Sequence, residues 1–292
     1  MLRVLNMQFV DLFCGVGGFT AGARRVATAL MGVDSDDSMV RLWAANAEAQ
    51  GVLADLWTDE ARVPEARPDL HVHMSPPCTL LSKARRCRGG APAKSLSGLD
   101  AALSFVRDGA YTSWSLETVS TPLTRSFMAQ WQEQNPKFSM SWTVVDAADY
   151  GTPSTRVRII AGNKQLVHEL RQVPVSRLSV LEAFAQAGLE VPTEHIKNNT
   201  KTKTGQPCVR SVQGPSHTQT ASHPLMWCDK HGNTQRCLTI AETAIVMGFP
   251  PTWMLPQHCR PAIRALGNAV PPALSYAIMS AAAQAAAKTK DN

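Results

Sequence analysis

A cysteine that could act as a nucleophile, Cys78, follows two prolines and an apolar run at residues 70–74. We expect its thiol near the carboxyl end of a buried strand. The segment after it, residues 79–99, contains five basic residues and no acidic one. Positive charge nearby favours the thiolate, which is the form of cysteine that attacks carbon. The alternative is an inert buried thiol, because free cysteine is among the most buried residue types.

A carboxyl group and two arginines follow later in the chain. Glu117 lies near the end of another apolar run, where a carboxyl group could act as a general acid. Arg156 and Arg158 alternate with period two, which predicts that both lie on one side of an extended chain. A guanidinium can bind a carboxylate, a phosphate or a carbonyl group. The alternatives are a solvent-exposed glutamate and a salt bridge between neighbouring strands.

A glycine-rich turn follows the first apolar run, in the sequence DLFCGVGGF at residues 11–19. Glycines between a strand and a helix allow the backbone to approach a ligand closely. The next apolar run ends in Asp34, where a carboxylate can accept hydrogen bonds from ribose hydroxyls. Position 20 is Thr, not the third glycine of the dinucleotide fingerprint, which argues against NAD or FAD. The turn predicts a nucleoside-cofactor pocket, with a purely structural turn as the alternative.

The elements that would position these residues alternate through the first 162 residues. The predicted strands are 8–13, 29–33, 70–74, 113–116, 139–145 and 157–161. The predicted helices are 19–28, 38–47, 97–107 and 123–134. Repeated strand-helix-strand units imply a mostly parallel sheet with helices on both faces and ligands at the carboxyl ends of the strands. We therefore predict an α/β fold with a Rossmann-like sheet.

The alternation weakens after Gly162. A short helix is predicted at residues 180–187, and helical patterns return at residues 240–247 and 273–287. Between them, the polar tract KNNTKTKTGQP at residues 197–207 has no apolar periodicity, so we predict an exposed loop.

The composition favours a folded protein with an anionic partner. The 292 residues are 44% apolar and 18% charged, which excludes a disordered chain, a collagen-like repeat and a coiled coil. The net charge is 29 − 23 = +6, and a basic surface attracts polyanions. Two stretches, 79–99 and 195–228, have basic but no acidic residues. The alternative is that both are solvated basic loops.

The seven cysteines are scattered and include no Cys-x-x-Cys pair. We therefore expect reduced thiols in a cytoplasmic protein and no metal site. Nothing in the sequence favours export or membrane insertion.

Several motifs occur in one order along the chain. They are Asp11–Gly18, Ser75–Cys78, Glu117–Val119, Arg156–Arg158, Arg236–Thr239 with Glu242, Gly248–Pro250 and Gly267–Pro272. In order and spacing these motifs resemble those of the cytosine-5 DNA methyltransferase family, from residue 8 to about residue 280. The resemblance implies a class I methyltransferase sheet, a small target-recognition domain and S-adenosylmethionine as methyl donor. It also implies double-stranded DNA as the partner, and we expect a monomer.

The resemblance assigns catalytic roles to four residues. Cys78 matches the nucleophile that attacks carbon 6 of cytosine, and Glu117 matches the acid at ring nitrogen 3 and the exocyclic amine. Arg156 and Arg158 match the arginines that hold the base and support the active-site loop. Attack at carbon 6 makes carbon 5 nucleophilic and splits one hard step into two easier ones. The base must leave the DNA stack to be reached.

The resemblance also assigns binding residues and domains. The residues expected to bind the cofactor are Phe13, Gly15, Gly17, Gly18, Asp34, Asp55, Pro77 and Asn268. The residues expected to bind DNA are Lys83, Arg85, Arg86, Arg88, Lys201, Lys203 and Arg210. Residues 1–162 with 263–292 would form the catalytic domain, and residues 163–262 the small target-recognition domain. The region left for reading bases is short, which predicts a short recognition site.

Four positions depart from the family pattern, namely Thr79, Thr118, Asp146 and Ser154. None removes an essential chemical group, but they affect the support of the base pocket. Two alternatives follow, a transfer RNA cytosine-5 methyltransferase and a DNA-binding paralogue with little catalysis. A nicotinamide oxidoreductase is a more distant alternative.

Overall fold

A seven-stranded sheet forms the larger part of the protein, for which the computed structural model describes residues 7–56, 62–77, 92–202 and 204–290. The strand order is β3-β2-β1-β4-β5-β7-β6. Its strands are β1 (Gln8–Leu12), β2 (Thr28–Asp34), β3 (Gln50–Leu53), β4 (Leu70–Met74), β5 (Trp114–Val119), β6 (Ser141–Asp146) and β7 (Val157–Gly162). The first five strands are parallel, and β7 is antiparallel to both β5 and β6. The predicted mostly parallel α/β sheet is therefore confirmed.

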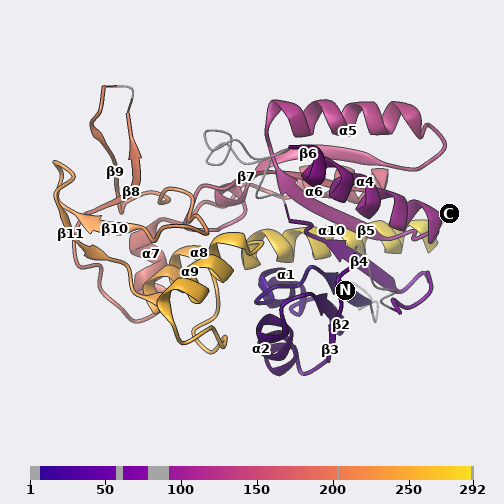
Figure 1. The fold of residues 1–292 in the computed structure, drawn as a ribbon, viewed down its shortest axis with the longest axis horizontal. Coiled ribbons are helices and arrows are strands. Elements are labelled where there is room, and N and C mark those ends of the chain that lie inside the picture. Colours follow the sequence, from indigo (N-terminus) through magenta and orange to yellow (C-terminus); the bar gives the residue numbers. More distant parts are fainter. Residues whose placement is uncertain (1–6, 57–61, 78–91, 203, 291–292) are drawn as a thin grey trace.

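Helices cover both faces of this sheet (Figure 1). They are α1 (Gly18–Ala23), α2 (Asp37–Ala47), α4 (Pro92–Asp108), α5 (Pro122–Gln134), α6 (Lys164–Gln172) and α10 (Pro272–Lys290). Alternate residues of one strand face opposite sides. Val10 and Leu12 of β1 pack in the core with α4 and α5, whereas Phe9 packs in the core with α1, α6 and α10. The side of β4 that faces α1 also carries buried polar residues, because His73 stacks on Phe19, so β4 alternates apolar residues with histidines.

A smaller sheet with the order β11-β10-β8-β9 forms a second core. Its strands are β8 (His195–Lys201), β9 (Pro207–Ser211), β10 (Met226–Cys228) and β11 (Thr234–Cys237). Three helices accompany this sheet, namely α7 (Val180–Gln186), α8 (Ile240–Met247) and α9 (Cys259–Asn268). Ile196, Trp227 and Phe184 are buried in its core. The β8–β9 hairpin extends away from the rest of the molecule (Figure 1).

The structure corrects several predicted elements. The tract 197–207 is not a loop, because most of it belongs to β8 and β9, which pair in antiparallel fashion. The predicted helix 19–28 ends at Ala23, since the chain turns there and the Thr28 amide donates to the Met7 carbonyl to begin β2. Strands β3, β10 and β11 and helices α6 and α9 were not predicted. Each is only three to ten residues long, so the sequence offers few residues from which to assign it.

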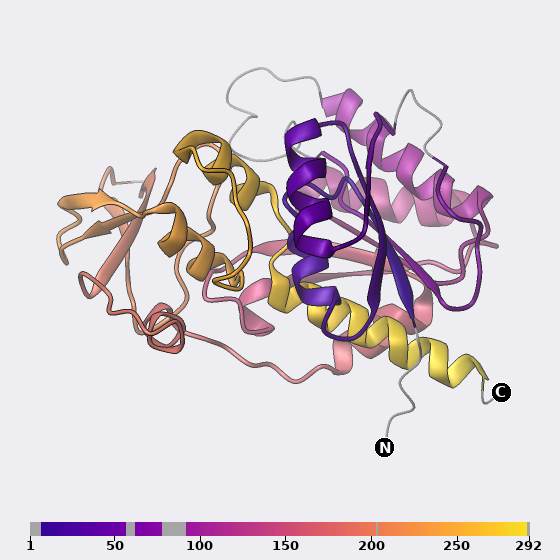
Figure 2. The same cartoon turned by 90° about the horizontal axis from the view of Figure 1, so that it is seen from below.

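Two ends of the chain meet on one face of the large sheet. Helix α10 runs beside α1 and the N-terminal strands (Figure 2). The hydroxyl of Ser275 donates to the Gly18 carbonyl at 3.3 Å. One face of the large sheet is thus covered by α10, which follows the small sheet in sequence.

Candidate active site

The segment that leads to Cys78 lies against the carboxyl end of β1. The Ser75 amide donates to the Leu12 carbonyl at 3.3 Å, and the Ser75 hydroxyl donates to the Phe13 carbonyl at 3.3 Å. Pro76 is buried and Pro77 is exposed. Cys78 itself lies outside the described residues, as do Thr79, Lys83, Arg85, Arg86 and Arg88. The described part of β4 therefore directs the chain toward the edge where the glycine-rich turn begins.

Glu117 and Arg158 form an ion pair at this edge. The Arg158 Nε and Glu117 Oε1 atoms are 2.7 Å apart, and the side chains are 13% and 5% exposed. The pair joins β5 to β7, because Val119 is the register partner of Arg158. Charged side chains are rarely so buried unless they are paired, so the guanidinium compensates the charge of the carboxylate.

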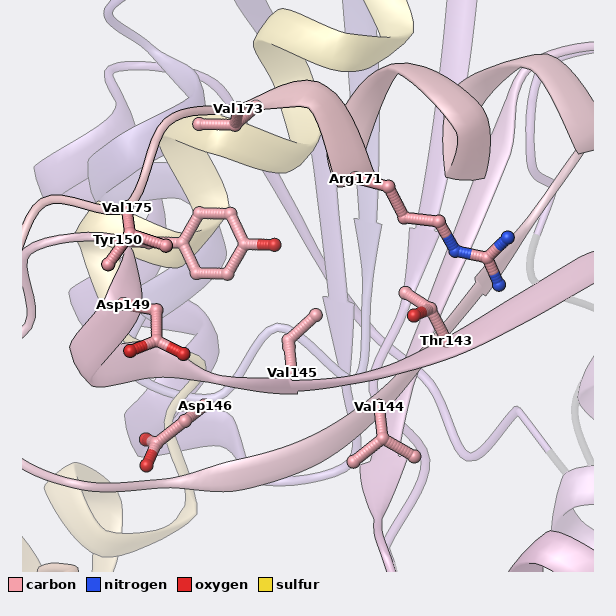
Figure 3. A pocket seen from close by; sticks show the side chains of 9 residues that line it. All are labelled: Thr143, Val144, Val145, Asp146, Asp149, Tyr150, Arg171, Val173 and Val175. Carbon is pink, nitrogen blue, oxygen red and sulfur yellow. The ribbon is translucent and has the colours of Figure 1, made fainter.

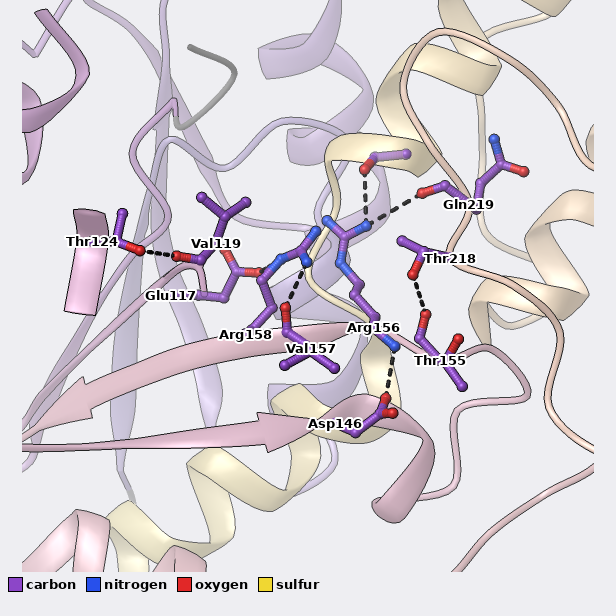
Figure 4. A network of polar contacts seen from close by, with 11 residues as sticks. Glu117, Val119, Thr124, Asp146, Thr155, Arg156, Val157, Arg158, Thr218 and Gln219 are labelled. Carbon is purple, nitrogen blue, oxygen red and sulfur yellow. Dashed lines mark hydrogen bonds and ion pairs between the residues drawn. The ribbon is translucent and has the colours of Figure 1, made fainter. Parts of the chain in front are cut away.

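Arg156 points to the same side of β7 but has other partners (Figure 4). Its Nη1 donates to the Gly267 carbonyl at 3.0 Å and to the Gln219 carbonyl at 3.4 Å. Its backbone amide donates to the Asp146 carboxylate at 2.7 Å. Period two thus places both arginines on one side, as predicted. Arg158 contacts Glu117, and Arg156 contacts the segment that precedes Asn268.

The structure shows the hydrogen-bonding environment of three residues that depart from the family pattern, Thr118, Asp146 and Ser154. The Ser154 hydroxyl donates to the His217 carbonyl at 2.9 Å. Asp146 accepts from the amides of Ala148 and Arg156. The Thr118 hydroxyl is buried without a hydrogen-bond partner among the described residues. Ser154 and Asp146 therefore support the backbone around β7.

The turn after β1 has a backbone shaped for close approach. Phe13, Gly15 and Gly17 all have positive φ, at 61°, 50° and 86°. A positive φ is uncommon for a bulky residue such as Phe and marks a site where the backbone conformation is constrained. No heavy atom of the described residues lies within 4 Å of the position that a Cβ of Gly15 would occupy, so this side of the turn is open among them.

Asp34 connects this turn to the end of β2. Its carboxylate accepts from the Gly15 amide at 2.8 Å and from the Asp36 amide at 3.0 Å. Burial raises the pKa of Asp34, although both hydrogen bonds lower it. Asp55 follows β3 and is half-buried. Since Leu53 is the register partner of Asp34, the two acidic residues lie at the same edge.

The segment Gly267–Pro272 lies against the glycine-rich turn. A Cβ on Gly18 would come within 2.4 Å of the Val270 carbonyl oxygen, so only glycine fits there. Asn268 is the exposed last residue of α9. The structure therefore brings the turn into contact with Asp34 and with the segment that contains Asn268.

The sequence analysis did not assign a role to Asp11, Thr20 or Trp43, which form a buried cluster below the turn. Asp11 is 1% exposed. It accepts hydrogen bonds from the Thr20 hydroxyl at 2.7 Å and the Trp43 indole at 3.3 Å. Burial raises its pKa to about 7, although these hydrogen bonds oppose the shift. Thr20 was the sequence feature that could have revealed this cluster. It stands where a dinucleotide fingerprint has glycine, and its hydroxyl donates to Asp11.

The predicted DNA-binding residues that the structure describes lie on the hairpin. Lys201 is exposed in β8. Arg210 is half-buried in β9, and its Nη1 donates to three oxygens, on Thr155, Pro215 and Ser216. Lys203 lies outside the described residues. The structure thus separates Lys201, which is free to meet a polyanion, from Arg210, which is engaged within the protein.

Two cavities lie away from this edge. One of about 220 Å³ lies between β6 and α6 and is lined by Tyr150, Arg171 and several valines (Figure 3). The other, of about 550 Å³, lies beside α1 and α2 and is lined by Arg24, Arg25 and Trp253. Neither is lined by Glu117, Arg158 or Asp34. Among the described residues, no group of three His, Cys, Asp or Glu could hold a metal ion. None of the described helices could cross a membrane.

Comparison with solved structures defines the class. A protein encoded within an E. coli prophage and proposed to be a DNA modification methyltransferase has a TM-score of 0.67 and 17% identity, covering 94% of this chain and 98% of its own. The methyltransferase EhMeth of Entamoeba histolytica has a TM-score of 0.62 and 13% identity, with 95% and 98% covered. Dnmt2 of S. pombe has a TM-score of 0.59 and 14% identity, with 94% and 98% covered. The fold is that of the α/β methyltransferases.

A family model identifies the family of the chain within this fold. The model of the C-5 cytosine-specific DNA methylases matches residues 7–96 and 161–284, and the chain belongs to this family. The resemblance predicted from the motifs is confirmed. A stretch of 67 residues is also 37% identical to the 23S rRNA (uracil(1939)-C(5))-methyltransferase RlmD of Hahella chejuensis, covering 23% of this chain. The chain spans only 13% of the length of that enzyme.

Proposed function

We propose that the protein is a DNA cytosine-5 methyltransferase that acts on a flipped-out cytosine within a short recognition site. The observation that carries this proposal is the buried Glu117–Arg158 ion pair, at 2.7 Å, beside the strand that leads to Cys78. An acid and a nucleophile that approach one base from neighbouring strands are what attack at carbon 6 requires.

The residues at the turn fit the cofactor that the family uses. The open side of Gly15 gives room for a ligand, and the Asp34 and Asp55 carboxyl groups provide acceptors for hydroxyl and amine donors. We propose that Asp34 binds the ribose, Asp55 the adenine, and that Phe13, Gly15, Gly17, Gly18, Pro77 and Asn268 surround S-adenosylmethionine. When bound there, this cofactor supplies the methyl group.

The chain's own groups perform the remaining steps. The Cys78 thiolate forms a bond to carbon 6 of cytosine while the protonated Glu117 carboxyl group gives its proton to ring nitrogen 3. Glu117 is then the carboxylate that pairs with Arg158, which holds it in place. After methylation, water takes the carbon 5 proton, the thiolate leaves carbon 6, and the Glu117 carboxylate takes back the proton from ring nitrogen 3, which restores the aromatic ring.

The β8–β9 hairpin would supply the contact with DNA. β8 pairs with β10 through residues 195–197, and beyond them, among the described strands, it pairs with β9 alone. A two-stranded antiparallel ribbon of this kind fits the major groove of B-DNA. The major groove of A-form RNA is too narrow for side chains to read. Exposed polar residues cover the outer part of the hairpin, among them Asn199, Thr200, Lys201 and Gln206. These residues offer amide and hydroxyl groups for base edges and an ammonium group for phosphate.

The test incubates the purified protein with labelled S-adenosylmethionine and either unmethylated DNA or transfer RNA. Mass spectrometry then identifies the labelled nucleoside. We expect label in 5-methyldeoxycytidine from DNA. Label in 5-methylcytidine from RNA would replace this proposal with the RNA alternative. No label from either, with cofactor and DNA bound, would point to a binding protein without catalysis.

A further inference from the structure

Arg210 lies at the junction between the hairpin and the catalytic sheet. Its Nη1 donates to the Ser216 carbonyl at 2.8 Å, to the Thr155 hydroxyl at 3.0 Å and to the Pro215 carbonyl at 3.3 Å. A guanidinium has five donors in a fixed fork. Here one of its nitrogens contacts three oxygens from two different segments.

These two segments are firmly joined. The Thr155 amide and hydroxyl both donate to the Ser216 carbonyl, at 3.0 and 3.1 Å. The Ser216 amide donates to the Pro153 carbonyl at 3.0 Å. Ser154 and Ser216 form a parallel bridge and are at most 1% exposed. Arg210 therefore binds a largely buried junction, and the contacts of its Nη1 hold β9 against it.

The junction continues directly into the catalytic strand. Thr155 precedes Arg156, and Arg158, three residues further on, forms the ion pair with Glu117. Burial and the positive charge of Arg210 lower the pKa of nearby His217 to about 4, so His217 is neutral at pH 7. Arg210 thus connects β9 to Thr155 by a hydrogen bond, and the backbone of residues 155–158 connects Thr155 to the Arg158–Glu117 ion pair.

We propose that Arg210 is a positioning residue that couples the β8–β9 hairpin to the Glu117–Arg158 pair. This inference rests on the proposed function. When DNA engages the hairpin, Arg210 keeps residues 155–158 in the position that presents Glu117 to the base. It acts through Thr155 and not on the substrate or a phosphate.

The test compares Arg210→Gln, Arg210→Lys and Lys201→Gln with the wild type on unmethylated DNA. The amount of enzyme that forms a covalent complex with DNA containing 5-fluorocytosine gives the concentration of competent enzyme. The kcat is then expressed per competent molecule. We expect Arg210→Gln to lower kcat about 10-fold or more, because small displacements of catalytic groups are costly. KM and the salt dependence of DNA binding should stay as in the wild type. Arg210→Lys should recover part of the loss, since an ammonium can still donate to these oxygens.

Lys201→Gln is the matched control on the same hairpin, and we expect the opposite pattern. It should raise KM and reduce the salt dependence while kcat is kept. The inference is overturned if Arg210→Gln behaves like Lys201→Gln, which would make Arg210 a phosphate contact. It is also overturned if only the count of competent enzyme falls, since that indicates a role in folding alone. A wild type that methylates no DNA refutes the proposed function before any variant is compared.

Discussion

Two buried carboxyl groups at the carboxyl edge of the large sheet have different surroundings. Glu117 faces the Arg158 guanidinium at 2.7 Å. Asp11 accepts hydrogen bonds from a hydroxyl and an indole, and burial raises its pKa to about 7. A guanidinium compensates a buried negative charge, whereas neutral donors do so only in part. The raised pKa of Asp11 therefore follows from burial beside donors that carry no charge.

Replacement of Asp11 by Asn should change how stability depends on pH. In the unfolded chain Asp11 loses its proton near its ordinary value of 3.8, whereas in the folded protein it keeps the proton to about pH 7. Unfolding therefore releases a proton between these values, and the wild type loses stability as the pH rises through them. The Asn variant lacks this loss, so between pH 5 and 8 it should gain about 2 kcal/mol relative to the wild type. Urea unfolding at both pH values measures this difference.

Asp229→Asn is the matched control for that experiment. Hydrogen bonds from Asn233 and from backbone amides lower the pKa of Asp229. A lowered pKa stabilises the folded state above the ordinary value of 3.8, so this variant should be less stable than the wild type by the same amount at pH 5 and at pH 8. Parallel curves for Asp11→Asn and the wild type would contradict the raised pKa of Asp11.

Replacement of Cys78 by Ala should abolish methyl transfer and leave cofactor binding intact. The proposed mechanism gives Cys78 the bond to carbon 6, and of the proposed cofactor residues only the neighbouring Pro77 lies on the same segment. Transfer of labelled methyl groups and calorimetric titration with S-adenosylmethionine measure the two properties. Cys237→Ala, at an exposed position in β11, should retain transfer. Turnover by the Cys78 variant would remove Cys78 from the mechanism.

At the scale of elements, the hairpin and the central strands show what a sequence can predict. β4 and β5 are buried along their whole length, and their alternating apolar residues were enough to predict them. β8 and β9 are partly exposed strands paired through their backbones, and Ile196 is the buried residue of β8. Their sequence has no alternation to detect. The Glu117 and Arg158 motifs predicted the site, but their pairing needed the register of β5 and β7.

The hairpin should contribute to the salt dependence of DNA binding. If Lys201 contacts a phosphate, Lys201→Gln removes one released counterion, and the slope of log K against log salt should fall by about 1. Binding titrations on one duplex at several salt concentrations measure the slope. Lys137→Gln, at an exposed position between α5 and β6, should leave the slope unchanged. An unchanged slope for Lys201→Gln would show that Lys201 contacts no phosphate and is simply exposed to solvent.

At the scale of the whole molecule, residues from both ends of the chain form the seven-stranded sheet and the helices that cover it. We propose residues 1–162 with 263–292 as the catalytic domain, and the packing of α6 adds residues 164–172 to it. Leu166, Val167 and Leu170 of α6 are fully buried in the same core as Leu274 and Ile278 of α10. Residue 162 marks the end of β7 and not the end of this core, which the fading strand-helix alternation could not reveal.

The contact of α1 with α10 should control both stability and cofactor binding. A Cβ on Gly22 would lie 1.9 Å from the Pro272 carbonyl oxygen and 2.7 Å from the Tyr276 amide nitrogen. Both atoms belong to the backbone, so α10 would have to move away from α1. We expect Gly22→Ala to lower the free energy of unfolding by about 1–3 kcal/mol, the usual cost of overpacking.

The same displacement should weaken binding of S-adenosylmethionine, because α10 continues from the segment that packs on Gly18. Denaturant unfolding and calorimetric titration measure the two effects. Gly214→Ala is the matched control, since no heavy atom of the described residues lies within 4 Å of its Cβ position. Loss of stability with unchanged cofactor affinity would separate the helix contact from the pocket. A Gly22 variant as stable as the wild type would show that the two helices can separate at no cost, and α10 would then not be needed to hold the glycine-rich turn.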